Sequence, residues 1–110
     1  MDTFAMRHRI TLQSPSAELD ATGQPASWND VATVWAAVEP LRGREYFAAQ
    51  QVNAETTTRI RIRYRAGVTS AMRGRYGSRT YDIVSVIDVD ERHVELQLMC
   101  TERKGGGAGG

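Results

Sequence analysis

The sequence contains few of the residues on which catalytic and metal sites depend. Its 110 residues include one cysteine and two histidines. A single cysteine excludes an intrachain disulfide, and it forms no CxxC or HxxxH spacing with which the two distant histidines could bind zinc. No stretch approaches the roughly 18 apolar residues of a membrane span, and the start of the chain lacks a signal peptide's apolar run. We therefore expect no metal, no cofactor, no membrane contact and synthesis in the cytoplasm.

Residues for catalysis are equally sparse. A nucleophilic triad needs Ser or Cys beside a His that an acid orients. His8 falls on the apolar side of an expected strand and His93 opens another, so we interpret both as structural. Cys100 lies among alternating leucines and is interpreted as a small buried side chain. The glycines fit neither GxxxxGK[ST] nor GxGxxG, and the acidic turn around Asp90 lacks the glycine of a calcium loop. The sequence predicts no enzymatic activity.

The composition predicts one ordinary globular domain. Hydrophobic residues make up 41% and charged residues 25% of the chain, and the formal net charge is +1. A chain of this length buries about 65% of its unfolded surface, enough for one core. The closing KGGGAGG has no side chains to bury. We expect a folded domain over residues 1–104 and a disordered glycine-rich tail over 105–110.

Alternation of apolar and polar residues indicates a mainly β fold. A long, mobile surface connection is expected over 14–27, and the run GREYFAAQQVN predicts one short helix over 43–53. Closure into a barrel removes exposed sheet edges. We therefore predict a small antiparallel β-barrel of five to six strands with one short helix. Its expected strands cover residues 6–13, 28–41, 56–66, 72–76, 79–88 and 93–102.

A row of arginines is the most unusual feature of the sequence. From residue 56 to residue 81 the chain has seven arginines and no acid. Within TTTRIRIRYRAG every second residue is an arginine, and alternate side chains of a strand share a face about 7 Å apart. We expect Arg59, Arg61, Arg63 and Arg65 to project together, with Ile60, Ile62 and Tyr64 in the core.

Three explanations of this arginine face stay open. It could be solvated or paired within the fold, because Thr11, Glu39, Glu95 and Glu102 lie on other expected strands. It could contact carboxylates of a neighbouring subunit. It could also touch DNA phosphates, although a single-strand binder usually places aromatic residues on the same face, whereas Tyr64 is expected to point inward.

Several motifs taken in order resemble the phage head-tail joining family, also called head closure, head completion or stopper proteins. The resemblance rests on five segments: MRHRITLQ at 6–13, VWAAVEPLRGREYFAAQ at 34–50, TRIRIRYR at 58–65, GVTSAMR at 67–73 and RTYDIVSVIDVDER at 79–92. Together they span about residues 6–102. The resemblance implies a structural protein with a small β-barrel and one helix.

The resemblance also implies partners and a location. The chain would form a six- or twelve-fold ring below the portal or adaptor protein of a DNA-filled head. It would close the channel through which double-stranded DNA passes and would present a surface for a tail or tail-terminator protein. It would be found in the host cytoplasm during assembly and in the neck of the finished particle. In related proteins the connection corresponding to residues 40–57 can project toward the channel, and its tip here carries Arg42, Arg44, Glu45, Tyr46 and Phe47. The alternative is a small β-barrel that binds nucleic acid directly through the Arg59–Arg65 face.

Overall fold

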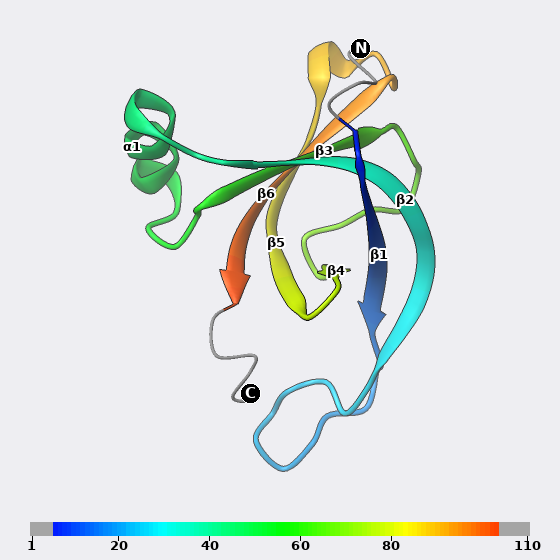
Figure 1. Cartoon of the computed structure of the whole chain (residues 1–110). Coiled ribbons are helices and arrows are strands. Elements are labelled where there is room, and N and C mark those ends of the chain that lie inside the picture. The colour runs from blue at the N-terminus through cyan, green and yellow to red at the C-terminus, as the bar shows by residue number, and fades with distance from the viewer. Residues whose placement is uncertain (1–5, 104–110) are drawn as a thin grey trace.

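The computed structural model describes residues 6–103 as a closed barrel of six antiparallel strands (Figure 1). The strands are β1 (His8–Pro15), β2 (Trp28–Pro40), β3 (Thr58–Arg63), β4 (Arg73–Tyr76), β5 (Arg79–Asp88) and β6 (Glu95–Arg103). Their order around the barrel is β1-β2-β3-β6-β5-β4, and β4 pairs with β1 to close it. Helix α1 (Gly43–Val52) joins β2 to β3, and a 3-10 helix, η2 (Val89–Glu91), joins β5 to β6. The predicted mainly β barrel with one short α-helix is confirmed, whereas the predicted tail 105–110 lies outside the described residues.

The core follows directly from the alternation in the sequence. Ile60 and Ile62 of β3 are almost completely buried, and in the register of β3 with β6 they lie opposite Leu98 and Leu96. Their neighbours on the same strand point outward, as the period of two requires. Inward residues of five strands, together with Met72 just before β4, meet in one buried cluster. Its buried members are Ile10, Leu12, Ala36, Ile60, Ile62, Met72, Tyr81, Ile83, Leu96, Leu98 and Cys100.

Closure of the barrel depends on a buried glycine in the short strand β4. Gly74 pairs with Leu12 of β1 on one side and with Tyr81 of β5 on the other. A Cβ atom built on Gly74 would lie 2.9 Å from Cγ2 of Ile10, closer than real Cβ contacts. The lack of a side chain at this position therefore lets β4 approach the core closely enough to pair with both neighbours.

Strand β3 ends earlier than predicted. Its last pair is Arg63 with Glu95, so Tyr64 and Arg65 lie beyond the strand. Tyr64 still donates its backbone N–H to the carbonyl of Val94, but its side chain is 39% exposed. The prediction that Tyr64 enters the core is wrong because β2 stops covering β3 at the pair Ala36–Ile62, which leaves residue 64 at the rim.

The final strand also begins later than predicted. His93 was expected to open it, but His93 has a backbone φ of 57° and lies in the turn before β6. Its backbone N–H donates to Oδ1 of Asp88, at the end of β5. This side-chain contact closes the turn, so pairing resumes only at Glu95.

The connection between β1 and β2 has its own hydrogen bonds. Strand β1 continues to Pro15, two residues further than predicted. Beyond it, Oδ1 of Asp20 accepts hydrogen bonds from the backbone N–H groups of Thr22 and Gln24 and from the Thr22 hydroxyl. An isolated bridge pairs Leu19 with Pro25. The expected surface connection is thus a closed loop organised by one aspartate.

Candidate interaction surfaces

The first half of the arginine row is paired within the fold. Arg59 and Arg61 flank the carboxylate of Glu39, because Glu39 lies directly opposite Arg59 in the register of β2 and β3. Nε of Arg59 lies 2.9 Å from Oε1 of Glu39, and Nη2 of Arg61 lies 3.0 Å from Oε2. Arg61 also lies 3.6 Å from a carboxylate oxygen of Glu95 on the other neighbouring strand. These two arginines therefore sit among acids of the same chain, as one of the three explanations predicted.

The same cluster ties helix α1 to the barrel. Glu45, in the first turn of α1, accepts a hydrogen bond of 2.7 Å from Nη1 of Arg59. This hydrogen bond is the main cause that raises the pKa of Arg59. Burial alone would raise the pKa of Glu39, but hydrogen bonds and charges of Arg59 and Arg61 outweigh it and hold that pKa below its ordinary value. Glu39 and Arg59 therefore stay charged at neutral pH, and the hydrogen bond from Arg59 to Glu45 holds the first turn of α1 against β3.

The second half of the row is open. Arg63 and Arg65 are exposed and form no ion pair with any residue of the described range 6–103. They line a shallow surface groove of about 270 Å³ together with Val34, Trp35 and Tyr64. We call this set of five residues the basic-aromatic groove. Of the four arginines expected in one row, Arg59 and Arg61 thus form ion pairs within the fold, whereas Arg63 and Arg65 do not.

Two aromatic rings stand at the basic-aromatic groove. Trp35 is 54% exposed, and the guanidinium of Arg9 lies over its ring at 4.9 Å from the centroid. The ring of Tyr64 packs against that of His93, with 4.5 Å between centroids. Sequence reasoning missed Trp35, although its place in VATVWAAV, one residue before buried Ala36, signals an outward side chain. Exposed Trp, Tyr and Arg side chains are the residue types that dominate binding energy at protein interfaces.

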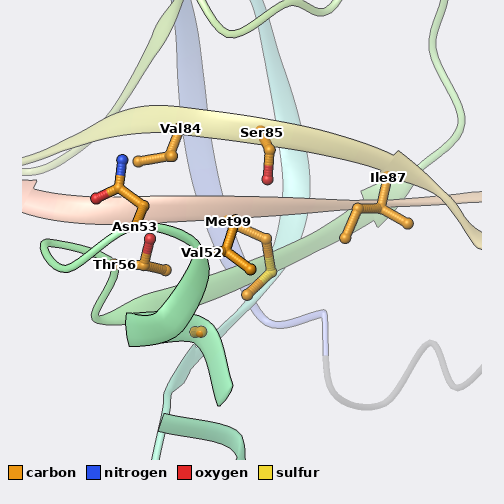
Figure 2. A pocket seen from close by; sticks show the side chains of 8 residues that line it. Val52, Asn53, Thr56, Val84, Ser85, Ile87 and Met99 are labelled. Atoms are coloured by element: carbon orange, nitrogen blue, oxygen red, sulfur yellow. The ribbon is translucent and has the colours of Figure 1, made fainter. Parts of the chain in front are cut away.

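A second hollow lies between α1 and strands β5 and β6. Figure 2 shows Val52 and Met99 in the middle of this hollow and Ile87 towards one end. Its volume is about 170 Å³ and its walls are almost entirely apolar. We call it the apolar groove. It is lined by Ala49, Val52, Asn53, Thr56, Val84, Ser85, Ile87 and Met99.

Helix α1 stands apart from the core. None of its residues is buried, and Figure 1 shows it projecting from one side of the barrel. Val52 is 88% exposed and Phe47 is 67% exposed. Apolar side chains exposed next to an apolar groove are typical of a surface that another protein covers.

The candidate channel residues all lie at the start of α1. Arg42 is the N-cap residue and contributes no side-chain cap, and Arg44 is exposed in the first turn. The rings of Tyr46 and Phe47 meet edge to face with centroids 5.6 Å apart. The structure therefore brings together Arg42, Arg44, Tyr46 and Phe47 on one exposed turn, while Glu45 is bound to Arg59.

The groups considered for chemistry have structural partners. Nδ1 of His8 lies 2.7 Å from the hydroxyl of Tyr76, and His93 pairs with Asp88. Burial raises the pKa of the Cys100 thiol to about 12. Within residues 6–103 no group of three or more His, Cys, Asp or Glu side chains could hold a metal ion. No helix of the described part is long and apolar enough to span a membrane.

Comparison with known proteins gives a consistent result. The family model described as phage head completion protein matches residues 1–103. Head completion protein gp7 of Enterobacteria phage HK97 is 24% identical over 106 residues, covering 91% of this chain and 95% of that protein.

Two solved structures share the fold. The solution structure of protein SF1141 from Shigella flexneri 2a has a TM-score of 0.73 and 28% identity, over 94% of this chain and 98% of that one. A chain in the virion of a native gene transfer agent particle has a TM-score of 0.58 and 18% identity, over 88% and 94% of the two chains. At that identity the second likeness is one of fold.

Proposed function

Because the chain belongs to the phage head completion protein family, we propose that it is a structural subunit of the head-to-tail connector of a tailed phage, prophage or gene-transfer agent. In this role it docks as a ring below the portal or adaptor protein, closes the DNA exit channel after packaging and presents the surface to which the tail attaches. The observation that carries the proposal is the family match over residues 1–103. The proposed role is structural and involves no catalysis.

The geometry of the barrel supports a role in assembly. Most strand edges are paired in the closed barrel, although residues 28–35 of β2 pair with β1 alone. Contacts with other proteins can use side-chain surfaces. The described residues offer two such surfaces of suitable chemistry, the basic-aromatic groove and the exposed apolar side of α1 with its groove.

The start of α1 suits the channel side of such a ring. Arg42 and Arg44 are exposed cations at the end of α1 nearest β2, and cations there would meet the phosphates of DNA passing through the channel. The mechanism is steric and electrostatic, since the 40–57 connection narrows the passage and its arginines hold the polyanion. We assign no base-specific contact to it.

Direct binding of nucleic acid through the Arg59–Arg65 face is the second candidate. Its support is the exposure of Trp35 and Tyr64 beside Arg63 and Arg65, an arrangement on which bases can stack. Against it, Arg59 and Arg61 already share Glu39. A salt titration with short single- and double-stranded DNA tests this candidate, because phosphate binding weakens steeply with salt. Absence of binding at low salt would remove it.

Adding the purified chain to heads that lack it tests the proposed function. DNA-filled heads would be prepared from a host that makes every other head protein but lacks this chain. We expect such heads to lose nuclease-protected DNA and to reject tails, and the added purified chain to restore both. Heads lacking only the tail proteins are the control, since they should retain DNA. Heads that keep DNA and join tails equally well without the chain would contradict the proposal.

A further inference from the structure

The two exposed surfaces lie at opposite ends of the same pair of strands. Strands β2 and β3 pair from Pro40–Thr58, beside α1, to Ala36–Ile62, beside the basic-aromatic groove. Trp35 is five residues from Pro40, a separation of about 17 Å along a strand at roughly 3.3 Å per residue. In Figure 1, α1 stands at the left and β3 runs from it toward the right. One copy of the chain therefore presents two different surfaces at separate places on the barrel.

We propose that these two surfaces are the two halves of one contact between neighbouring copies of this chain. Trp35 and Tyr64 of one copy pack on α1 and the apolar groove of the next. Arg63 and Arg65 of the first copy then lie beside the C-terminal end of α1 of the second. This inference rests on the proposed function, because it specifies how the connector ring holds together.

Apolar complementarity supports this pairing. The apolar groove is a hollow lined in part by exposed Val52, and in the basic-aromatic groove Trp35 is a large exposed ring. An aromatic anchor that fills an apolar pocket is the usual centre of a protein interface. Each feature exposes apolar area that the other would cover, since Val52 is 88% exposed and Trp35 stays 54% exposed with Arg9 over its ring.

Charge complementarity supports the same orientation. The C-terminal end of a helix carries a partial negative charge, and the last turn of α1 contains no basic residue to offset it. Glu55 follows two residues beyond Asn53, is exposed, and its carboxylate has no partner among the described residues. Arg63 and Arg65 are the unpaired cations that this negative end would attract.

The geometry determines the kind of symmetry. A two-fold dimer joins the same patch on both copies, whereas a contact between two different patches passes from copy to copy and closes into a ring when the rotation allows it. Because the two patches are formed by different residues of one barrel, the proposed contact is of the second kind.

Thiol cross-linking in assembled heads tests the proposal. The native Cys100 is buried and its pKa is raised to about 12, so a maleimide reacts with introduced thiols only. The variant Val52→Cys/Tyr64→Cys places one thiol on each surface. Heads carrying it would be treated with a short bismaleimide and separated under denaturing conditions. We expect a ladder of covalent oligomers.

Matched variants make the result specific. Each single variant should remain monomeric on the gel, and Val52→Cys/Ala21→Cys should as well, since Ala21 is exposed in the distant β1–β2 loop. Dimers from Val52→Cys alone would show a two-fold contact between helices and overturn the proposal. Heads that contain the double variant but give no ladder would also overturn it, while leaving the proposed function intact.

Charge reversal provides an independent readout if the cysteine variant fails to join heads. Arg65→Glu should lower the number of copies bound per head at least tenfold, and a second change, Glu55→Arg, should restore most of it. Lack of rescue would contradict the contact. A different result would be that packaged DNA protects a Tyr64→Cys thiol from maleimide while the double variant gives no ladder. The basic-aromatic groove would then contact DNA and not a neighbouring copy. A wild-type chain that never joins heads would refute the proposed function, and the contact with it.

Discussion

Arg61 donates two hydrogen bonds to a single oxygen of Glu39, from Nε at 3.2 Å and from Nη2 at 3.0 Å. The side chain of Arg61 is only 16% exposed and that of Glu39 is 32% exposed. Arg63, two residues further along β3, has no such partner in the described chain. Two arginines that look equivalent in the sequence therefore have different roles, one in the fold and one on its surface.

Alanine substitutions should separate these roles. Arg61→Ala removes two hydrogen bonds to a partly buried carboxylate, and we expect it to lower the free energy of unfolding by about 1 kcal/mol. Arg63→Ala should change it by less than about 0.5 kcal/mol, because an exposed, unpaired side chain contributes little. Urea unfolding of the two variants and the wild type measures the difference. Equal destabilisation by both substitutions would contradict the division of the row.

The stabilising effect of Glu39 should depend on pH. Its pKa in the folded state lies below the ordinary 4.5, so its contribution is present at neutral pH and is lost as the pH falls from about 4.5 through the folded value. Glu39→Gln should accordingly be less stable than the wild type near pH 7, and this difference in unfolding free energy should shrink as the pH falls below 4.5. Unfolding curves at several pH values measure it. A difference in unfolding free energy that does not change with pH would show that the charge of Glu39 does not contribute to stability.

Alternation along the chain was enough to predict the barrel, because one side of each strand faces a single core. It could not predict which acid meets which arginine, since that depends on the register of β2 against β3. The alternation also could not predict that Tyr64 and Arg65 lie outside the sheet. The apolar–basic alternation continues through both residues, but β2 no longer covers β3 there, and the chain leaves the sheet.

The candidate surfaces were predicted only in part. The helix over 43–53 was found from its composition, yet its isolation from the core is a property of the folded chain. Trp35 was missed because a tryptophan in a strand rich in Val and Ala suggests burial. Its exposure follows from its position between the inward residues Val34 and Ala36, which lie at a closely packed part of the barrel wall.

Gly74 should resist substitution although its backbone conformation suits any residue. Gly74→Ala places a methyl group against Ile10, and overpacking of this kind costs about 1–3 kcal/mol. On an Ile10→Ala background the same change should cost much less, because the atom that it meets is gone. A double-mutant cycle of unfolding free energies measures this coupling. Additive costs would indicate that the close approach to Ile10 is unimportant.

Cys100 should be unreactive until the barrel opens. Its thiol is fully buried and its pKa is raised to about 12, so little thiolate exists at neutral pH and no reagent can reach it. We expect negligible labelling by a maleimide in the native protein and complete labelling in urea. Mass spectrometry after timed labelling measures both states. Rapid labelling of the native chain would contradict the closed barrel and would also invalidate the cross-linking test.

Electron cryomicroscopy of the neck tests the central claim most directly. DNA-filled, tailless heads assembled with the wild-type chain would be compared with heads assembled without it. The account predicts a ring of density below the portal or adaptor that fits the six-stranded barrel, with α1 of each copy against the Trp35 surface of the next. Heads with identical necks in the two preparations would contradict it.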